Sequence, residues 1–182
     1  GTRPDCINDD LLDYFEELNQ RTFLIVEYGV ETCNDATLRL INRGHDFDCA
    51  KQAIERTASR GIRVGAHIIL GLPGEDENES LRQAPIISSL PLTTLKIHQM
   101  QIIRGTKLAK MYEEHPFHLY SVDEYIHLIA EYISRLRADL ILERFVSQSP
   151  PELLIAPKWG LKNYEFTHRL NNYMKKHCIK KC

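Results

Sequence analysis

Residues 63–75 have the sequence Arg-Val-Gly-Ala-His-Ile-Ile-Leu-Gly-Leu-Pro-Gly-Glu. The first eight residues form a short apolar run, which predicts a buried strand, and the Gly-Leu-Pro-Gly-Glu that follows predicts a sharp turn. Amphipathic helical patterns flank this strand at residues 46–60 and 76–90. A strand between two helices is typical of a βα repeat in a parallel sheet.

The same alternation extends along the chain in both directions. Further strands are predicted at residues 23–30, 94–102 and 140–145, and further helices at 9–18, 35–41 and 121–136, the second closed by Gly44. Asn8 and Asn34 or Asp35 suit helix N-caps, Ser121 and Glu124 form a capping box, and Pro85 should kink or shift its helix. We expect an α/β fold with parallel strands joined by right-handed crossovers. Four strands cannot close an eight-strand barrel, so the prediction is a partial, incomplete TIM-type barrel or a doubly wound sheet.

The composition is that of a globular protein. The chain has 182 residues, of which 43% are hydrophobic and 26% charged, enough for one substantial core. No apolar run approaches the roughly 20 residues that cross a bilayer, so we expect a soluble, cytoplasmic protein with no membrane contact. The five cysteines are an odd number, widely spaced and without a CxxC pair, which argues against a disulfide framework. Cys178 and Cys182 could share a helix face, but two thiols alone make a poor metal site.

Charge is distributed unevenly along the chain. Residues 158–182 hold seven Lys or Arg and one acid, whereas the preceding part is acidic. The basic tail has two interpretations: a solvated helix face with cations at its favourable C-terminal end, or a contact for RNA.

Polar residues gather where the predicted strands end, which is where ligands bind in parallel α/β folds. Because side chains alternate along a strand, Glu27, Gly29 and Glu31 share one face, as do Gly65, His67 and Ile69 on the next strand. Glycines there would leave room for a ligand ring, Ile69 would offer an apolar surface, and Glu31 could accept hydrogen bonds from ribose hydroxyls. Arg43 could reach a carboxylate from the following helix. An alternative stays open, in which Glu27 and His67 form a satisfied interior pair and the glycines only make turns.

Five segments, taken in order, resemble radical S-adenosylmethionine (SAM) enzymes. They are Thr2-Arg-Pro-Asp, Glu27-Tyr-Gly-Val-Glu-Thr, Ile41-Asn-Arg-Gly-His, His67-Ile-Ile-Leu-Gly-Leu-Pro-Gly-Glu and Lys96-Ile-His-Gln-Met-Gln-Ile-Ile-Arg-Gly-Thr. Within that superfamily the chain is most similar to a bacterial branch of Fe-S oxidoreductases near the Elongator catalytic subunit and, more distantly, to oxygen-independent coproporphyrinogen oxidases. Leu154-Ile-Ala-Pro-Lys-Trp-Gly also resembles that branch, without a function attached to it.

The resemblance implies a set of SAM contacts. Glu31 stands where the family contacts the ribose, and Arg43 where it contacts the methionine carboxylate. Ile69 and Gly71 fall in the segment that packs on adenine, and the strand end from Gln101 to Ile103 would offer backbone contacts to the same ring. Thr2 and Arg3 lie at a further strand end that faces SAM. By strand parity, Glu27, His67, Lys96 and His98 are candidates for contacts with the substrate or with the residues that bind it.

The 4Fe-4S cluster of the family has no ligand loop in this sequence. Its CxxxCxxC motif, whose three thiolates leave one iron free to chelate SAM, is missing, and Cys6, Cys33 and Cys49 lack the spacing. We therefore expect the C-terminal half of a radical SAM enzyme, inactive alone, with residues 1–147 as half of the barrel and 148–182 as an extension with a basic helix. The complete enzyme would use a reduced cluster to cleave SAM into a 5'-deoxyadenosyl radical that acts on an unknown substrate, RNA among the candidates.

Three rival hypotheses remain at this point. A cluster-free α/β protein could bind a phosphate or nucleotide on the turn from Gly71 to Glu75. The basic tail could make the chain an RNA-binding module. The eight histidines suggest a metal site as a third hypothesis, although the sequence contains no HxH or HExxH pattern.

Overall fold

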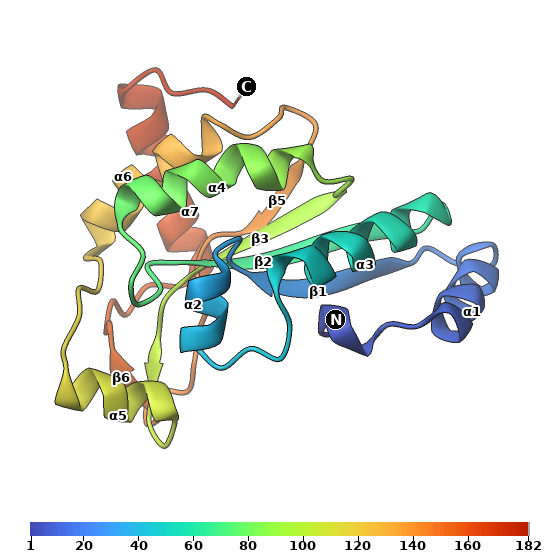
Figure 1. Ribbon diagram of the computed structural model, residues 1–182. Coiled ribbons are helices and arrows are strands. Elements are labelled where there is room, and N and C mark those ends of the chain that lie inside the picture. Colours follow the sequence, from blue (N-terminus) through green and yellow to red (C-terminus); the bar gives the residue numbers. More distant parts are fainter. Residues whose placement is uncertain (182) are drawn as a thin grey trace.

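A four-stranded parallel sheet organises the molecule, in a computed structural model that describes residues 1–181 (Figure 1). Its strands are β1 (Ile25–Glu31), β2 (Arg63–Leu70), β3 (Thr94–Gln99) and β5 (Ile141–Arg144), in that spatial order. Every neighbouring pair is parallel. The crossovers carry the helices α3 (Phe47–Ser59), α4 (Glu77–Ser89) and α6 (Val122–Ile133). The predicted α/β fold with parallel βα repeats is confirmed.

The apolar face of the sheet forms the core with these helices. Strand residues alternate between buried and half-buried along β1, as the period of two predicts. Apolar residues fill most of the buried strand positions, among them Val26, Tyr28, Val30, Ala66, Ile68, Leu70, Leu95 and Ile97, whereas Thr94 and Gln99 of β3 are buried polar residues. Tyr28 is completely buried, and its hydroxyl lies 2.7 Å from Thr57 Oγ1 of α3. Burial of each large aliphatic side chain here contributes about 1.5–3 kcal/mol.

Polar N-caps start the helices close to where the sequence predicted them. Asn8 caps α1 (Asp9–Asn19) and Asn34 caps α2 (Asp35–Leu40). Ser121 and Glu124 make the predicted capping box of α6. The prediction that Gly44 closes the second helix is wrong, because α2 already ends at Leu40 and the chain turns at Asn42, whose φ is 60°.

The predicted strand at residues 94–102 is two strands. β3 ends at Gln99, and β4 (Ile102–Ile103) then pairs antiparallel with β6 (Leu154–Ala156), outside the main sheet. The helix α5 (Lys107–Glu114), which the sequence analysis did not predict, follows β4. A run of β-forming residues does not reveal that its second half has a different partner, since that partner lies some 50 residues further on.

The C-terminal segment packs on the same core. Helix α7 (Asn163–Lys176) buries Phe166 and Leu170 in the main cluster of apolar side chains and contacts α6. Its basic residues, among them Arg169, Lys175 and Lys176, are exposed. Cys182 lies outside the described residues, so the helix face that it could share with Cys178 is not described either.

Helix α4 continues through Pro85. This proline is on the exposed side of the helix, where the carbonyl group that loses its hydrogen bond can face water. Within residues 1–181, no helix combines the length and the apolar character needed to cross a membrane.

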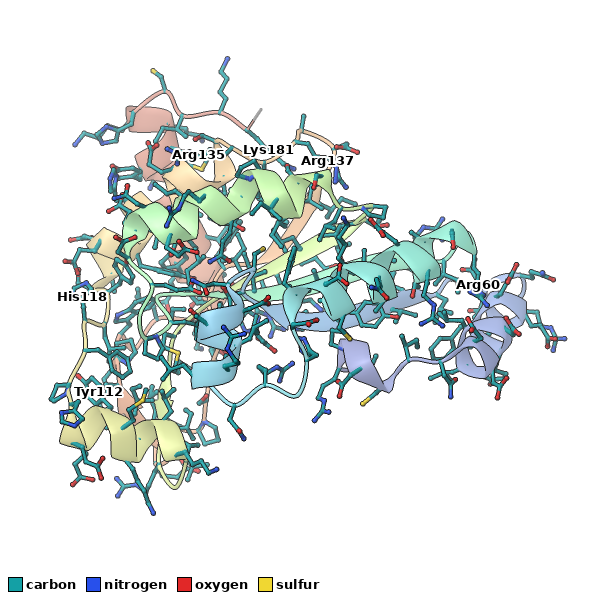
Figure 2. The ribbon with its side chains drawn as sticks, viewed as in Figure 1. Arg60, Tyr112, His118, Arg135, Arg137 and Lys181 are labelled. Carbon is teal, nitrogen blue, oxygen red and sulfur yellow. The ribbon has the colours of Figure 1, made fainter. Side chains whose placement is uncertain are left out.

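Figure 2 labels Arg60 and Arg137, two arginines near the amino ends of the strands. Arg60 lies at the end where strands begin and pairs with Asp13 of α1 at 2.8 Å. Arg137, at the start of β5, donates hydrogen bonds to backbone carbonyl groups that precede β3. The contacts of Arg60 and Arg137 therefore stabilise the end of the sheet where the strands begin. Neither arginine lies at the carboxyl ends of the strands.

Candidate functional site

The face of the sheet opposite the core carries a cluster of charged and imidazole side chains, which we call the polar-face cluster: Glu27, His67, Lys96, His98 and Glu143. Lys96 donates a hydrogen bond to Glu27, and its Nζ lies 3.3 Å from Glu143 Oε2. His67 Nε2 lies 3.3 Å from Glu27 Oε2, and the His67 and His98 rings are 5.5 Å apart. The structure therefore brings together all four residues that strand parity singled out.

Glu143 is a member of this cluster that the sequence analysis missed. It lies on β5, whose strand character was predicted but whose two faces were not compared. The same alternation that selected Lys96 would have offered Glu143 as a candidate.

Charges within the cluster compensate one another. Burial acts to raise the pKa of the Glu27 carboxyl, but the hydrogen bond and charge of Lys96, with His67, outweigh it and hold that pKa below its ordinary value. Burial acts to lower the pKa of Lys96, whereas Glu27 and Glu143 raise it. Burial, together with the electrostatic influence of His67, Arg144 and Lys96, lowers the pKa of His98 to about 4. At neutral pH the cluster therefore holds a Lys96–carboxylate ion pair beside a neutral His98.

Glycine at position 65 makes room for this arrangement. A Cβ there would lie 2.7 Å from Thr94 Oγ1, closer than packed atoms allow, and 3.1 Å from Glu27 Cγ, a tight contact. Thr94 is 4% exposed, and its hydroxyl has no hydrogen-bond partner within residues 1–181.

Glu31 and Arg43 meet at the carboxyl end of β1. Arg43 Nη2 lies 2.9 Å from Glu31 Oε1 and donates to the Gly29 carbonyl oxygen at 2.9 Å. Glu31 has a φ of 67°, a left-handed conformation that is strained for a residue with a side chain, and the register of β1 shifts at this point. Burial raises the pKa of Glu31, and Arg43 opposes that shift.

The backbone at Gly29 forms a cradle for this pair. A Cβ at position 29 would lie 2.6 Å from Glu31 Oε1 and 2.9 Å from Arg43 Nη2. Within the described part of the chain, the buried Nε of Arg43 has no partner. The carboxylate oxygens of Glu31 can accept hydrogen bonds, and the Arg43 guanidinium can donate them, beside the bare backbone of Gly29. Such a set of groups is suited to hydroxyl groups and a carboxylate of a ligand.

The first residues of the chain lie beside β1. Thr2 N donates to the Glu27 carbonyl oxygen at 2.8 Å, and Gly29 N donates to the Thr2 carbonyl oxygen at 3.2 Å, as in a parallel pair of strands. Arg3 pairs with Asp5, and a Cβ on Gly44 would lie 3.0 Å from Arg3 Nη2. Thr2 and Arg3 thus reach the same edge of the sheet as Glu31.

The residues predicted to contact adenine lie in different environments. Ile69 packs with Leu72, Met100 and Ile102 in a small apolar cluster at the carboxyl edge. The side chain of Gln101 instead donates to the Ser147 carbonyl oxygen at 3.2 Å and accepts from Ser149 Oγ at 2.7 Å. Ile103 belongs to the short ladder between β4 and β6.

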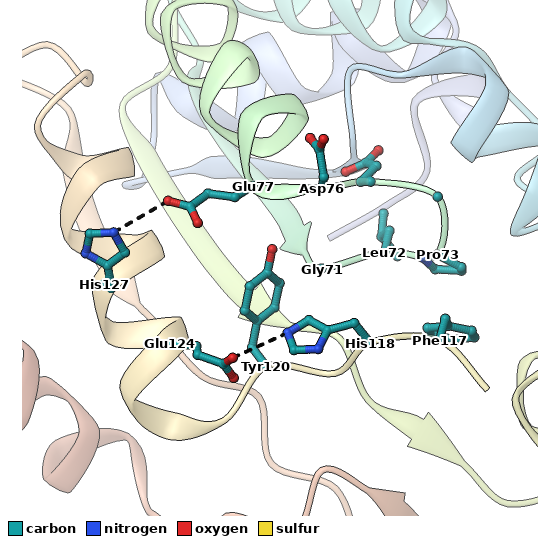
Figure 3. A pocket seen from close by; sticks show the side chains of 12 residues that line it. Gly71, Leu72, Pro73, Asp76, Glu77, Phe117, His118, Tyr120, Glu124 and His127 are labelled. Carbon is teal, nitrogen blue, oxygen red and sulfur yellow. Dashed lines mark ion pairs between the residues drawn. The ribbon is translucent and has the colours of Figure 1, made fainter.

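The turn after β2 borders a cavity of about 550 Å³ (Figure 3). Gly71, with a φ of 81°, packs against the Tyr120 ring, which projects into the middle of the group of side chains drawn. Four carboxylate residues line the cavity, Glu75, Asp76, Glu77 and Glu124, and no Lys or Arg does. The Asp76 side chain also occupies the first turn of α4 by accepting from Glu79 N at 2.7 Å. Negative charge and a filled helix N-terminus make this turn unfavourable for a phosphate.

Glu75 has a structural function that the sequence did not reveal. It is 8% exposed, accepts a hydrogen bond from Thr32 and another from Gln83 at 3.1 Å, and so connects the loop after β1 to α4. Burial raises the pKa of this carboxyl, although its hydrogen bonds act in the opposite direction.

An iron-sulfur cluster does not fit the described residues. Cys6, Cys33, Cys49 and Cys178 are all free thiols, and residues 1–181 contain no group of three His, Cys, Asp or Glu that could hold a metal ion. Burial, and then the charges of Glu75, Glu79 and Asp35, raise the pKa of Cys33 well above its ordinary value, so this thiol is a poor ligand and nucleophile.

A parallel βα sheet with polar groups on one face and at the carboxyl ends of its strands is typical of α/β folds that bind ligands at that edge. Comparison with known families makes the class specific. The model of the radical SAM superfamily matches residues 1–82, and that of the radical SAM C-terminal domain matches residues 92–176. The chain belongs to the radical SAM superfamily.

Individual relatives agree with this assignment. The chain is 37% identical over 171 residues to the "Uncharacterized protein YtqA" of Bacillus subtilis, covering 94% of this chain and 53% of the relative. It is 27% identical over 188 residues to a tRNA uridine(34) acetyltransferase of Methanocaldococcus jannaschii, covering 100% of this chain and 33% of the relative. The chain thus spans about half the length, or less, of these two relatives.

The solved structure of the archaeal Methanocaldococcus infernus Elp3 with an N-terminal deletion has the same fold. Its TM-score is 0.86 at 22% identity, covering 99% of this chain and 42% of the Elp3 chain.

Proposed function

We propose that this chain forms the SAM-binding wall of a radical SAM enzyme. The observation that carries the proposal is the Glu31–Arg43 pair over the Gly29 cradle, at the carboxyl edge of a parallel sheet in a chain of this superfamily. In this superfamily a reduced 4Fe-4S cluster cleaves bound SAM to a 5'-deoxyadenosyl radical. Residues 1–181 contain no group of three residues that could hold a metal ion, so the proposal assigns the cluster ligands to residues other than these.

Each binding group has a defined task under this proposal. Glu31 accepts hydrogen bonds from the ribose hydroxyls, and Arg43 holds the methionine carboxylate with donors that include its free Nε. Ile69 and the Gly71 turn pack on adenine, backbone groups from Gln101 to Ile103 bind the ring edge, and Thr2 and Arg3 close the site next to β1. The sheet forms part of a TIM-type barrel from residues 1–147, and residues 148–182 are an extension.

We further propose that the polar-face cluster contacts the substrate. Its side chains project from the same sheet face as Glu31, and Lys96 remains 16% and Glu27 23% exposed. The substrate itself is unidentified, and the reaction on it belongs to a cytoplasmic enzyme of which this chain is one part.

Release of 5'-deoxyadenosine tests the proposal. A longer protein that includes this chain and a CxxxCxxC segment would be reconstituted with iron and sulfide, reduced with dithionite and assayed with SAM. We expect product from that protein and none from the 182-residue chain alone. Absence of a CxxxCxxC segment from the rest of the gene would contradict the proposal outright.

RNA is a candidate for this substrate, and two observations favour it. Arg169, Lys175 and Lys176 are exposed along α7, and one relative bears the name of a tRNA-modifying enzyme. Truncation after Gly160 cannot test this, because it removes the buried Phe166 and Leu170. Lys175→Ala/Lys176→Ala keeps the core intact, and it should weaken a tRNA gel shift about tenfold at low salt and by less at high salt. Unchanged tRNA binding would exclude this face.

A further inference from the structure

A second cavity lies at the carboxyl ends of β3 and β5, and its volume is about 550 Å³. Its walls come from Gln99 and Gln101, from residues 147–149 after β5, and from the segment 154–162. This segment includes the Leu154–Gly160 sequence, for which the family resemblance implies no function. The cavity lines the same edge of the sheet as the proposed SAM site but uses other side chains.

The cavity is held in shape by hydrogen bonds across the fold. Ser147 N donates to Gln99 Oε1 at 2.7 Å, and both Gln99 and Gln101 donate to the Ser147 carbonyl oxygen. Trp159 Nε1 donates to the Tyr120 carbonyl oxygen at 3.1 Å. The Trp159 ring also lies nearly parallel to that of Phe166, with an interplanar angle of 7°. These contacts fix the walls before any ligand arrives, which lowers the entropic cost of binding.

The lining combines flat apolar surface with positive charge. Leu154, Pro157 and Leu161 contribute the apolar part together with Trp159. Lys158 and Lys162 are exposed at the cavity, and within residues 1–181 neither forms an ion pair. No Asp or Glu lines the cavity. This is the reverse of the cavity beside Gly71, where acids line the walls and cations do not.

We propose that this cavity binds an organic anion, made of a flat apolar ring and a phosphate or carboxylate group. The ring packs between Trp159 and the aliphatic side chains, and the anionic group lies at Lys158 and Lys162. Lysine is suited to such a group because it offers a mobile point charge with three donors. The assignment of this anion to the enzyme's substrate rests on the proposed function. The cavity and its binding of such an anion do not depend on that function.

Trp159 is the only tryptophan in the sequence, so its fluorescence reports on this cavity alone. Phenyl phosphate, phenol and inorganic phosphate would be titrated into the 182-residue chain. We expect saturable quenching by phenyl phosphate in the millimolar range or tighter, and at least tenfold weaker effects of phenol and phosphate, since each supplies only half of the recognised chemistry.

Two double variants separate the cavity from general charge. Lys158→Ala/Lys162→Ala should weaken phenyl phosphate binding about tenfold. Lys175→Ala/Lys176→Ala removes the same charge from α7, away from the cavity, and should leave binding within about twofold. All four lysines are exposed, so neither variant threatens the fold.

Three results would overturn the assignment: no quenching by phenyl phosphate, equal quenching by phenol, or equal losses in the two double variants. None of them depends on SAM or on an iron-sulfur cluster. Failure of this site would therefore leave the proposed function standing, and absence of 5'-deoxyadenosine release would leave this site standing.

Discussion

The two faces of the four-stranded sheet differ in what their side chains do. The face towards α3, α4 and α6 is closely packed and apolar, with Leu95 and Tyr28 completely buried. The opposite face carries Glu27, His67 and Lys96, which are half-buried and compensate one another's charges. Burial on the apolar face stabilises the fold. It offsets the free-energy cost of holding half-buried charged groups on the polar face.

The largest effect should come from the apolar face. Leu95→Ala leaves a cavity at a site with no exposure, and we expect the free energy of unfolding to fall by about 2–5 kcal/mol. Urea denaturation measures the change. Ile141→Ala on β5 is the matched control: its side chain is 55% exposed, and its loss should cost less than about 1 kcal/mol. Similar costs for both variants would remove the distinction between the two faces.

A smaller effect should follow from crowding the carboxyl end of β1. Gly29→Ala places a methyl group 2.6 Å from Glu31 Oε1 and 2.9 Å from Arg43 Nη2. Displacing this pair should destabilise the fold by about 1–3 kcal/mol. In the Arg43→Ala background one of the two clashes is absent, so the cost of Gly29→Ala should shrink. Equal costs in the two backgrounds, again by urea denaturation, would show that the cradle is not fitted to Arg43.

The effect that is smallest at neutral pH concerns the pH dependence of stability. The pKa of His98 is about 4 in the folded chain, below the ordinary value of 6.5, so the unfolded chain binds the extra proton between these two values. This histidine therefore makes the free energy of unfolding fall as pH decreases from 6.5 towards 4. In His98→Gln that contribution should vanish and the slope should decrease. His115→Gln, at an exposed position, is the control; a slope equal to that of wild type in His98→Gln would contradict the assignment.

The alternating pattern of the apolar face could be predicted because it is local. The bounds of β2, Arg63–Leu70, match the predicted strand, and the capping box at Ser121 was recognised from four consecutive residues. The meeting of Glu27, His67 and Lys96 followed from strand parity once a parallel order was assumed. Each of these inferences needs only the chain geometry of a strand or helix.

Features that depend on distant partners could not be predicted. Gln99 and Gln101 bind residues 147–149, and β4 pairs with β6, although no local pattern announces either contact. Glu31 and Arg43 were predicted to bind different parts of one ligand, and the structure shows that they bind each other. That ion pair depends on the register shift of β1 and on the left-handed backbone of Glu31, and the residue types predict neither feature.

The central claim is that Glu31 and Arg43, at the carboxyl end of β1, bind SAM. Its most direct test is calorimetric titration of SAM into the longer, cluster-reconstituted protein, as wild type and as Arg43→Gln, with cluster content matched by absorbance. We expect Arg43→Gln to bind SAM at least tenfold more weakly, because the carboxylate loses a charged donor. The 182-residue chain alone should bind it weakly or not at all. Equal affinity in wild type and Arg43→Gln, or tight binding by the chain alone, would contradict the account.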